Sequence, residues 1–340
     1  MAPMVDPAPM ADPIPPAMAP FLAQGSPFPL PVTLEPIPLR VLLLGCWGQV
    51  GQALQKVLGQ QRGITVIPWD RSQLDLSHLG QEFDRLTQAV QALRPQVIIN
   101  AAAYTGVDRA ETEPDLAQAI NGTALQFLTQ VAHQAQAALI HISTDYVFNG
   151  FGHRPYGEDE APDPLGIYGR SKLAGERAIL AHPCDRHVIL RTAWVYSEYD
   201  RPNFLKTMVR LGLEREEVRV VADQVGSPTW AQDIAQVIAA WLPRIHEDPS
   251  LSGIYHYSNS GVASWYDFAM AIFEEAAALG YPLKLQRLVP ITTADYPTPA
   301  QRPAYSVLDC HKIRQTLQFT PPHWRHSLRQ AFQALPPPIP

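Results

Sequence analysis

VLLLGCWGQVG, residues 41–51, is a short apolar run that passes into three glycines and then into a helical pattern over 52–58. Glycine lets a backbone approach a pyrophosphate closely, and the amides that begin a helix face its negative charge. The stretch therefore predicts the strand, turn and helix of a dinucleotide site. A turn in which glycine serves only tight packing is the alternative. The predicted cofactor contacts in this stretch are Gly45, Gly48, Gln49, Val50 and Gly51.

A second predicted strand, residues 64–71, ends in an acid and a base, Asp70 and Arg71. An acidic residue at this place in a Rossmann unit binds the ribose hydroxyls of NAD, whereas an arginine accommodates the 2'-phosphate of NADP. Because both are present, the sequence leaves the choice between NADPH and NADH open. The predicted cofactor contacts here are Asp70, Arg71, Asp75 and Leu76.

Two further runs, 96–104 and 138–148, read as buried parallel strands. The first ends in Ala101, Ala102 and Ala103, whose small side chains leave room for a flat ligand outside the strand ends. Close helix packing is the other reading of these alanines. The second run delivers Thr144, a hydroxyl that suits a substrate carbonyl oxygen, although a threonine after a strand is often a cap or turn residue.

Tyr168 and Lys172 are four residues apart in a segment with a helical pattern. This spacing puts the phenol and the ammonium on one face, one turn apart, where the cation stabilises a developing phenolate. An unperturbed tyrosine has a pKa of about 10 and is a reluctant acid at neutral pH. A solvated helix face is the alternative for the pair alone, but Thr144 precedes it on the next element of an alternating strand–helix series. The predicted catalytic set is Thr144, Tyr168 and Lys172, and the last two also count as cofactor contacts.

With these motifs together, the chain resembles the extended short-chain dehydrogenase/reductase superfamily and, more narrowly, its dTDP-4-dehydrorhamnose reductases. Asn149, Gly166 and Tyr305 depart from the Asp, Asn and Asn that are usual in that family. The motifs that carry the narrower resemblance run in family order from about residue 39 to about 315: Gly48-Gln49-Val50-Gly51, Ser143-Thr144-Asp145-Tyr146-Val147-Phe148, Pro155-Tyr156-x-Glu158, Tyr168-Gly169-x-Ser171-Lys172-Leu173-x-Gly175-Glu176, Leu190-Arg191-Thr192-x-Trp194-Val195-Tyr196, Asp223-Gln224-x-Gly226-Ser227-Pro228-Thr229 and Arg302-Pro303.

The resemblance implies reduction of the C4 ketone of dTDP-4-dehydro-L-rhamnose to dTDP-L-rhamnose, with NADPH or NADH as hydride donor. Tyr168 would protonate the carbonyl oxygen, Thr144 would polarise the carbonyl, and Lys172 would hold the nicotinamide ribose and lower the pKa of Tyr168. Two alternatives stay open: a reductase or epimerase of another nucleotide-linked 4-keto sugar, and a non-catalytic regulatory subunit of the same fold. The predicted substrate contacts are Tyr104, Thr144, Asp145, Trp194, Gln224, Thr229 and Arg302.

Composition agrees with a soluble enzyme of small molecules. A chain of 340 residues with 46% hydrophobic content allows one or two domains of ordinary size. The net charge of -6 and the lack of a Lys/Arg block argue against nucleic-acid binding. The three cysteines, Cys46, Cys184 and Cys310, predict no disulfide framework and no metal site, as expected in a reducing cytoplasm. A homodimer, and magnesium at its contact, are implied by the resemblance alone.

The expected fold class is α/β, a Rossmann-type doubly wound parallel sheet with a smaller α/β substrate-binding lobe. Residues 1–38 hold 12 of the 34 prolines and are predicted to be a disordered extension, with no secretory signal and no membrane span. Residues 39–193 and about 232–258 are assigned to the Rossmann domain, and about 194–231 and 259–335 to the nucleotide-sugar lobe. Within them, the pattern predicts helices over 117–136, 233–242 and 265–279, and a strand over 253–258. The active site is expected between the two lobes.

Overall fold

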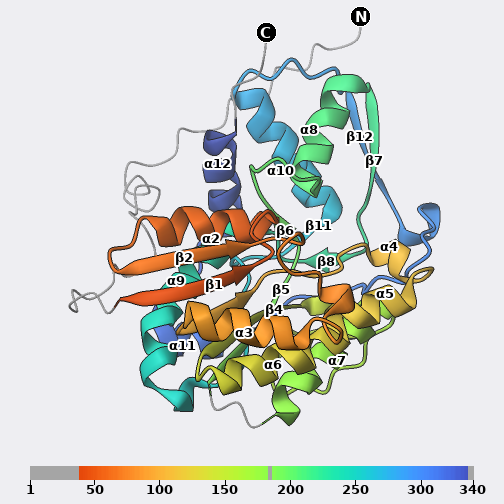
Figure 1. Cartoon of the computed structure of the whole chain (residues 1–340). Helices are drawn as coiled ribbons and strands as arrows, with labels where there is room; N and C mark the ends of the chain where they lie inside the picture. Colours follow the sequence, from red (N-terminus) through yellow and green to blue (C-terminus); the bar gives the residue numbers. More distant parts are fainter. Residues whose placement is uncertain (1–37, 183–185, 336–340) are drawn as a thin grey trace, which may run out of the picture.

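A six-stranded parallel sheet forms the centre of the computed structural model, which describes residues 38–182 and 186–335 (Figure 1). The predicted disordered extension lies, apart from its last residue, outside the described residues. Neighbouring strands follow the order β10-β5-β4-β3-β1-β2, and every pair is parallel. The predicted doubly wound fold is therefore confirmed. The strands of this sheet are β1 (Leu39–Leu44), β2 (Ile64–Trp69), β3 (Val97–Asn100), β4 (Ala138–Thr144), β5 (His187–Thr192) and β10 (Gly253–His256).

Helices cover both faces of the sheet, and this explains the continuous apolar runs in its central strands. Successive side chains of β1 point to opposite faces: Val41 and Leu43 join one core cluster, Leu42 and Leu44 the other. The first cluster is completed by α2, α9 and α11, and the second by α3, α6 and α7. The bounds of these helices are α2 (Gln49–Gly59), α3 (Phe83–Leu93), α6 (Ala124–Gln134), α7 (Ile167–Ala181), α9 (Ala231–Glu247) and α11 (His311–Leu317).

The helix predicted over 117–136 is divided into three parts in the structure. A π-helical turn, η3 (Ala119–Thr123), separates α5 (Pro114–Gln118) from α6. A π turn places one extra residue in the helix and is frequent at functional sites. The short elements on the same side of the sheet are α4 (Val107–Ala110) and the 3-10 turns η2 (Leu76–His78) and η4 (Asp145–Val147).

Between β5 and α9 the chain leaves the central sheet, and it returns to the sheet through α9 and β10. The helix predicted over 233–242 is longer than expected and contains Pro243, and the predicted strand over 253–258 is β10, which pairs with β5. The 3-10 turn η5 (Pro249–Leu251) connects the two. Within the described ranges, none of the helices has both the length and the apolar composition that crossing a membrane requires.

A second group of elements lies beyond the carboxyl end of the sheet, at the top of Figure 1. It has its own core, which includes Tyr196, Leu205, Phe268 and Trp324. The assignment of these segments to a separate substrate lobe stays a prediction. The elements are β6 (Val195–Tyr196), α8 (Phe204–Glu214), β7 (Glu217–Val221), β8 (Val225–Gly226), β9 (Thr229–Trp230), β11 (Ala263–Ser264), α10 (Trp265–Ala278), β12 (Arg287–Ile291), η6 (Thr293–Asp295) and α12 (Trp324–Ala334).

The strand order fixes where a ligand binds. β1 lies between β2 and β3, so the connections that follow β1 and β3 leave the sheet toward opposite faces. In open α/β sheets a ligand occupies the crevice outside the carboxyl ends of the strands at such a switch point. The glycine turn after β1 and the alanines after β3 both lie there.

Candidate active site

The three glycines of the turn after β1 have different tasks. Gly45 has a φ of 77°, and a Cβ there would lie 2.6 Å from the amide nitrogen of Ala102; at Gly51 it would lie 2.2 Å from the Gly45 oxygen. Packing therefore requires these two glycines. A Cβ on Gly48 would lie 3.3 Å from the Gly45 oxygen, a tight contact but a looser one than at the other two glycines. Gly48 precedes α2, a helix start with no side-chain cap, where free backbone amides suit a dinucleotide pyrophosphate.

The remaining predicted cofactor contacts border this turn. Asp70 and Arg71 follow the end of β2, and Arg71 Nε donates to Asp75 Oδ2 at 2.9 Å. The alanines at 101–103 are half-buried at the end of β3. Leu76, by contrast, is buried in the core cluster under α3 and α6, so its side chain serves packing.

Gln49 and Val50 connect the turn to the neighbouring segment and to the core. The amide of Gln49 accepts from Ser197 Oγ at 2.9 Å and donates to the Val195 carbonyl at 3.5 Å. Val50 packs against the core cluster on the α2 face. The side chain of Gln49 is therefore occupied with the segment at β6.

Thr144 and Tyr168 meet where β4 ends and α7 begins. A Cβ on Gly169 would lie 2.2 Å from the Tyr146 carbonyl oxygen, so glycine lets the first turn of α7 rest on η4. The Tyr146 and Tyr168 rings are in edge contact, with centroids 5.5 Å apart. The Thr144 hydroxyl donates to Asp145 Oδ1 at 3.1 Å, accepts from the Tyr146 amide at 3.2 Å and acts electrostatically on the Tyr168 phenol.

Burial raises the pKa of Tyr168 to about 12, and the neighbouring Thr144 hydroxyl works against this rise. This direction is opposite to the expectation that Lys172 lowers the pKa of Tyr168. The ammonium of Lys172 donates to the Ile142 carbonyl at 2.7 Å and lies 3.1 Å from His141 Nε2, so nearer groups engage it. At neutral pH the phenol therefore carries its proton and is able to donate it.

Lys172 is buried in a chain of polar groups that sequence reasoning missed. The Ala102 amide donates to Asn100 Oδ1 at 3.1 Å, and the Asn100 amide nitrogen lies 3.1 Å from His141 Nδ1. Burial lowers the pKa of Lys172 to about 8 and that of His141 well below its usual value. Asn100 and His141 thus link the nitrogen of Lys172 to the backbone at the switch point. The sequence signal that could have found Asn100 and His141 is that each is a polar residue inside an apolar strand.

A buried ion pair lies behind α7. Arg191 Nη2 and Glu176 Oε2 are 2.6 Å apart, and each side chain is 1% exposed. Ser143 Oγ donates to Glu176 Oε1 at 2.5 Å, and Arg191 Nη1 lies 3.3 Å from His256 Nε2. These contacts join β4, α7, β5 and β10 and fix α7 on the sheet. Both charged residues belong to the quoted motifs, where their role in positioning was not recognised.

Asn121, in the π turn η3, is a second residue that sequence reasoning missed. Its amide donates to Ser171 Oγ and to the Tyr104 carbonyl, both at 3.0 Å, and accepts from the Tyr104 amide at 2.9 Å. A Cβ on Gly175 would lie 2.1 Å from the Asn121 carbonyl oxygen, so α7 passes close to the π turn. Nothing in the local pattern announced this contact, because it joins segments 50 residues apart.

Three of the predicted substrate contacts gather around the catalytic set. Asp145 is buried beside Thr144, and burial raises its pKa to about 6, against hydrogen bonds from Ser306 and Thr144. Arg302 Nη2 donates to Asp108 Oδ2 at 2.7 Å, and its charge acts on Tyr146. Tyr104 is buried, and its hydroxyl donates to Glu113 Oε2 at 2.5 Å.

The other three contacts have different partners. Trp194, with a φ of 49°, stacks on Trp265 with centroids 3.5 Å apart, and Gly226 lies against its indole. Gln224 Nε2 donates to Thr293 Oγ1 at 3.1 Å. Thr229 is fully buried, and its hydroxyl donates to the Ser227 carbonyl at 3.0 Å, so it holds its own loop. The structure therefore does not bring Thr229 to the site.

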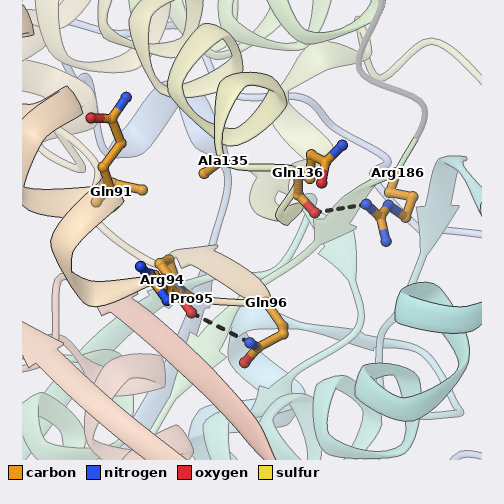
Figure 2. Close-up of a pocket in the computed structure, with 8 residues that line it drawn as sticks. Gln91, Arg94, Pro95, Gln96, Ala135, Gln136 and Arg186 are labelled. Carbon is orange, nitrogen blue, oxygen red and sulfur yellow. Dashed lines mark hydrogen bonds between the residues drawn. The ribbon is translucent and has the colours of Figure 1, made fainter.

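A cavity of about 460 Å³ lies at the opposite end of the sheet (Figure 2). Arg186 Nη2 donates there to the Gln136 carbonyl at 2.7 Å. The lining residues precede β3, β4 and β5, so the cavity is at their amino ends and away from the catalytic set; they are Val90, Gln91, Arg94, Pro95, Gln96, Ala135, Gln136 and Arg186.

Among residues 38–182 and 186–335, there is no cluster of three or more His, Cys, Asp or Glu side chains able to hold a metal ion.

The parallel sheet, the glycine turn and the Thr144–Tyr168–Lys172 set together define a short-chain dehydrogenase/reductase of the extended type. The family described as RmlD substrate binding domain matches residues 39–336, and the chain belongs to that family. The chain is 40% identical over 297 residues to dTDP-4-dehydrorhamnose reductase of Escherichia coli K12, covering 87% of this chain and 98% of that protein.

Two further relatives agree. The dTDP-4-dehydrorhamnose reductase of Aggregatibacter actinomycetemcomitans is 42% identical over 291 residues, covering 85% of this chain and 97% of that protein. The crystal structure of dTDP-4-dehydrorhamnose reductase from Bacillus anthracis in complex with NADP superimposes with a TM-score of 0.79 at 39% identity, covering 88% of this chain and 100% of that one.

Proposed function

We propose that the chain is a dTDP-4-dehydrorhamnose reductase, which reduces the C4 ketone of dTDP-4-dehydro-L-rhamnose with NADPH or NADH. The observations that carry the proposal are that Thr144 at the end of β4 lies beside Tyr168, with Lys172 one turn further along α7, and that the chain matches its family over residues 39–336. The alignment with this chain covers nearly the whole length of two relatives that carry this name.

The residues divide the chemistry between them. Bound reduced nicotinamide supplies the hydride, which is chemistry of the cofactor. Tyr168 holds its proton at neutral pH and donates it to the carbonyl oxygen as negative charge develops there, since a sugar alkoxide is a stronger base than a phenolate. The Thr144 hydroxyl, whose oxygen accepts from the Tyr146 amide, would turn its proton from Asp145 Oδ1 to the same oxygen and so polarise the carbonyl. Lys172, one helical turn from Tyr168, would hold the nicotinamide ribose.

Binding of the nucleotide sugar is assigned to the opposite side of the site. Arg302 presents a guanidinium whose planar fork matches the oxygens of a diphosphate. Asp108 holds one edge of this fork, which orients it beside Tyr146. From the sheet side, Asp145 and Tyr104 are proposed contacts of the sugar. A homodimer, a magnesium ion at its contact and a cytoplasmic location stay predictions from the resemblance and the composition.

A coupled assay tests the proposal. dTDP-glucose, purified 4,6-dehydratase and 3,5-epimerase would supply the keto sugar, and the loss of reduced-cofactor absorbance would be followed with NADPH and NADH in turn. Turnover that depends on the epimerase is the expected result. Turnover without it would indicate another 4-keto sugar. Cofactor binding without turnover on any 4-keto sugar, with a stoichiometric enzyme partner in a pull-down, would indicate a regulatory subunit.

A further inference from the structure

Trp47 is an exposed indole inside the glycine turn between β1 and α2. Its relative exposure is 55%, and it lies between Gly45 and Gly48. The side chain is nevertheless held in place, because its Nε1–H donates to Asp70 Oδ2 at 3.0 Å. The backbone carbonyl of Trp47 accepts from Arg201 Nε at 2.8 Å and from Gln52 Nε2 at 3.1 Å. The indole is thus a fixed part of the turn that faces the adenosine side of the site.

Its partner, Asp70, is the residue that would accept from the ribose hydroxyls of NAD. Both carboxylate oxygens already accept a hydrogen bond: Oδ1 from the Ser72 amide at 2.7 Å and Oδ2 from the indole of Trp47. Hydrogen bonds from Ser72, and in smaller part from Trp47, hold the pKa of Asp70 below its usual value. A ribose hydroxyl has to share Oδ2 with the indole N–H, which reduces what NAD gains there.

Arg71, the next residue, is suited to the other cofactor. Its side chain is 75% exposed, and it binds Asp75 Oδ2 through Nε at 2.9 Å, a contact that does not use the two terminal guanidinium nitrogens. Terminal guanidinium nitrogens bind phosphate oxygens in pairs. The indole N–H also compensates part of the negative charge of Asp70, which would otherwise repel a 2'-phosphate.

We propose that Trp47 is a specificity-determining residue that biases the dinucleotide site toward NADPH, by engaging the Asp70 carboxylate and leaving Arg71 to bind the 2'-phosphate. The inference rests on the proposed function only in that it takes the turn after β1 as the cofactor site. Trp47 acts through the hydrogen bond from its indole N–H to Asp70, so the proposed effect depends on both residues.

Calorimetric titration of the full chain with NADP+ and with NAD+, without sugar, tests this directly. The wild type is expected to bind NADP+ more tightly. Trp47→Phe keeps a ring but removes the N–H, and should reduce the NADP+ preference by about tenfold, mainly through tighter binding of NAD+. A matched control is Trp230→Phe, which removes an indole N–H that donates to Glu198 Oε2 at 2.8 Å. This control should leave the preference unchanged.

A double-mutant cycle separates the proposed contact from a general effect of the ring. In an Asp70→Ala background, which has no side-chain acceptor, the Trp47→Phe change should have little effect on the preference. Thermal unfolding of each variant would verify that it is folded. The proposal is overturned if Trp47→Phe leaves the ratio of the two dissociation constants within about twofold of the wild type, if its effect persists unchanged in the Asp70→Ala background, or if the wild type does not favour NADP+. Because no turnover is measured, a chain that behaves as expected here but reduces no keto sugar would overturn the proposed function alone.

Discussion

The two sides of the candidate site are built differently. On the sheet side, Lys172, Glu176 and Arg191 are each 1% exposed and bind groups from other elements of the same core. On the loop side, the side chain of Arg302 is 22% exposed and its ion pair with Asp108 lies at the surface. Buried polar groups have to be fully paired, whereas exposed ones exchange partners with water at little cost. The sheet side is thus rigid before any ligand binds, and the loop side is free to exchange protein contacts for substrate contacts.

The largest expected effect is on the free energy of unfolding, and it tests whether the two sides differ. Glu176→Gln removes the charge that compensates Arg191, and should lower the free energy of unfolding by about 3–5 kcal/mol. Asp108→Asn breaks the corresponding pair on the loop side and should cost less than about 1 kcal/mol. Urea unfolding of both variants, followed by tryptophan fluorescence, checks this. Equal losses for the two variants would show that the pairs do not differ as the exposures indicate.

The second prediction concerns kcat and a residue on the sheet side, Tyr168. Tyr168→Phe removes the proposed proton donor and should lower kcat by at least about a hundredfold, with little change in the dissociation constant of NADP+. Tyr296→Phe, at a tyrosine that is 61% exposed, is the matched control and should retain activity. The coupled assay and a separate cofactor titration give the two quantities. Near-normal kcat in Tyr168→Phe would refute the assignment of Tyr168 as the acid.

The third prediction moves to the loop side. Arg302→Ala removes a guanidinium held beside Tyr146 and should raise KM for the keto sugar about tenfold, with kcat changed much less, because a binding contact is lost in ground and transition state alike. Arg210→Ala, in an exposed pair with Glu214 on α8, should change neither constant. Steady-state kinetics with each variant decides the matter. A fall in kcat at constant KM would place Arg302 in the chemistry instead.

The same comparison explains what could be predicted from the sequence. The strand before Gly45 and the spacing of Tyr168 and Lys172 are local patterns, because a strand or a helix repeats its geometry along the chain. Those predictions specify the sheet and the catalytic set. The contacts of Asn121 and His141 join separate elements, so only the folded chain shows them. On the loop side the motif around 223–229 predicts Thr229 as a substrate contact, whereas its hydroxyl binds the Ser227 carbonyl, because an irregular loop directs each side chain individually.

The smallest expected effect is a pH dependence that differs in sign between the two sides. Burial raises the pKa of Asp145 to about 6, above its unfolded value, so its protonation in the folded state stabilises the fold below that value and this contribution is lost as pH rises through 6. From pH 7 to pH 5, the wild type should therefore gain about 1 kcal/mol of unfolding free energy relative to Asp145→Asn.

Asp295, on the loop side, accepts from the amide and hydroxyl of Thr292, and these bonds lower its pKa. Its contribution is present above the unfolded pKa and is lost as pH falls, so relative to Asp295→Asn the wild type should lose stability toward acid. Urea unfolding of the three proteins between pH 7 and pH 4 measures both trends. The same sign for both variants would mean that burial does not distinguish these carboxyls, and that the sheet side of the site is more open to water than its contacts indicate.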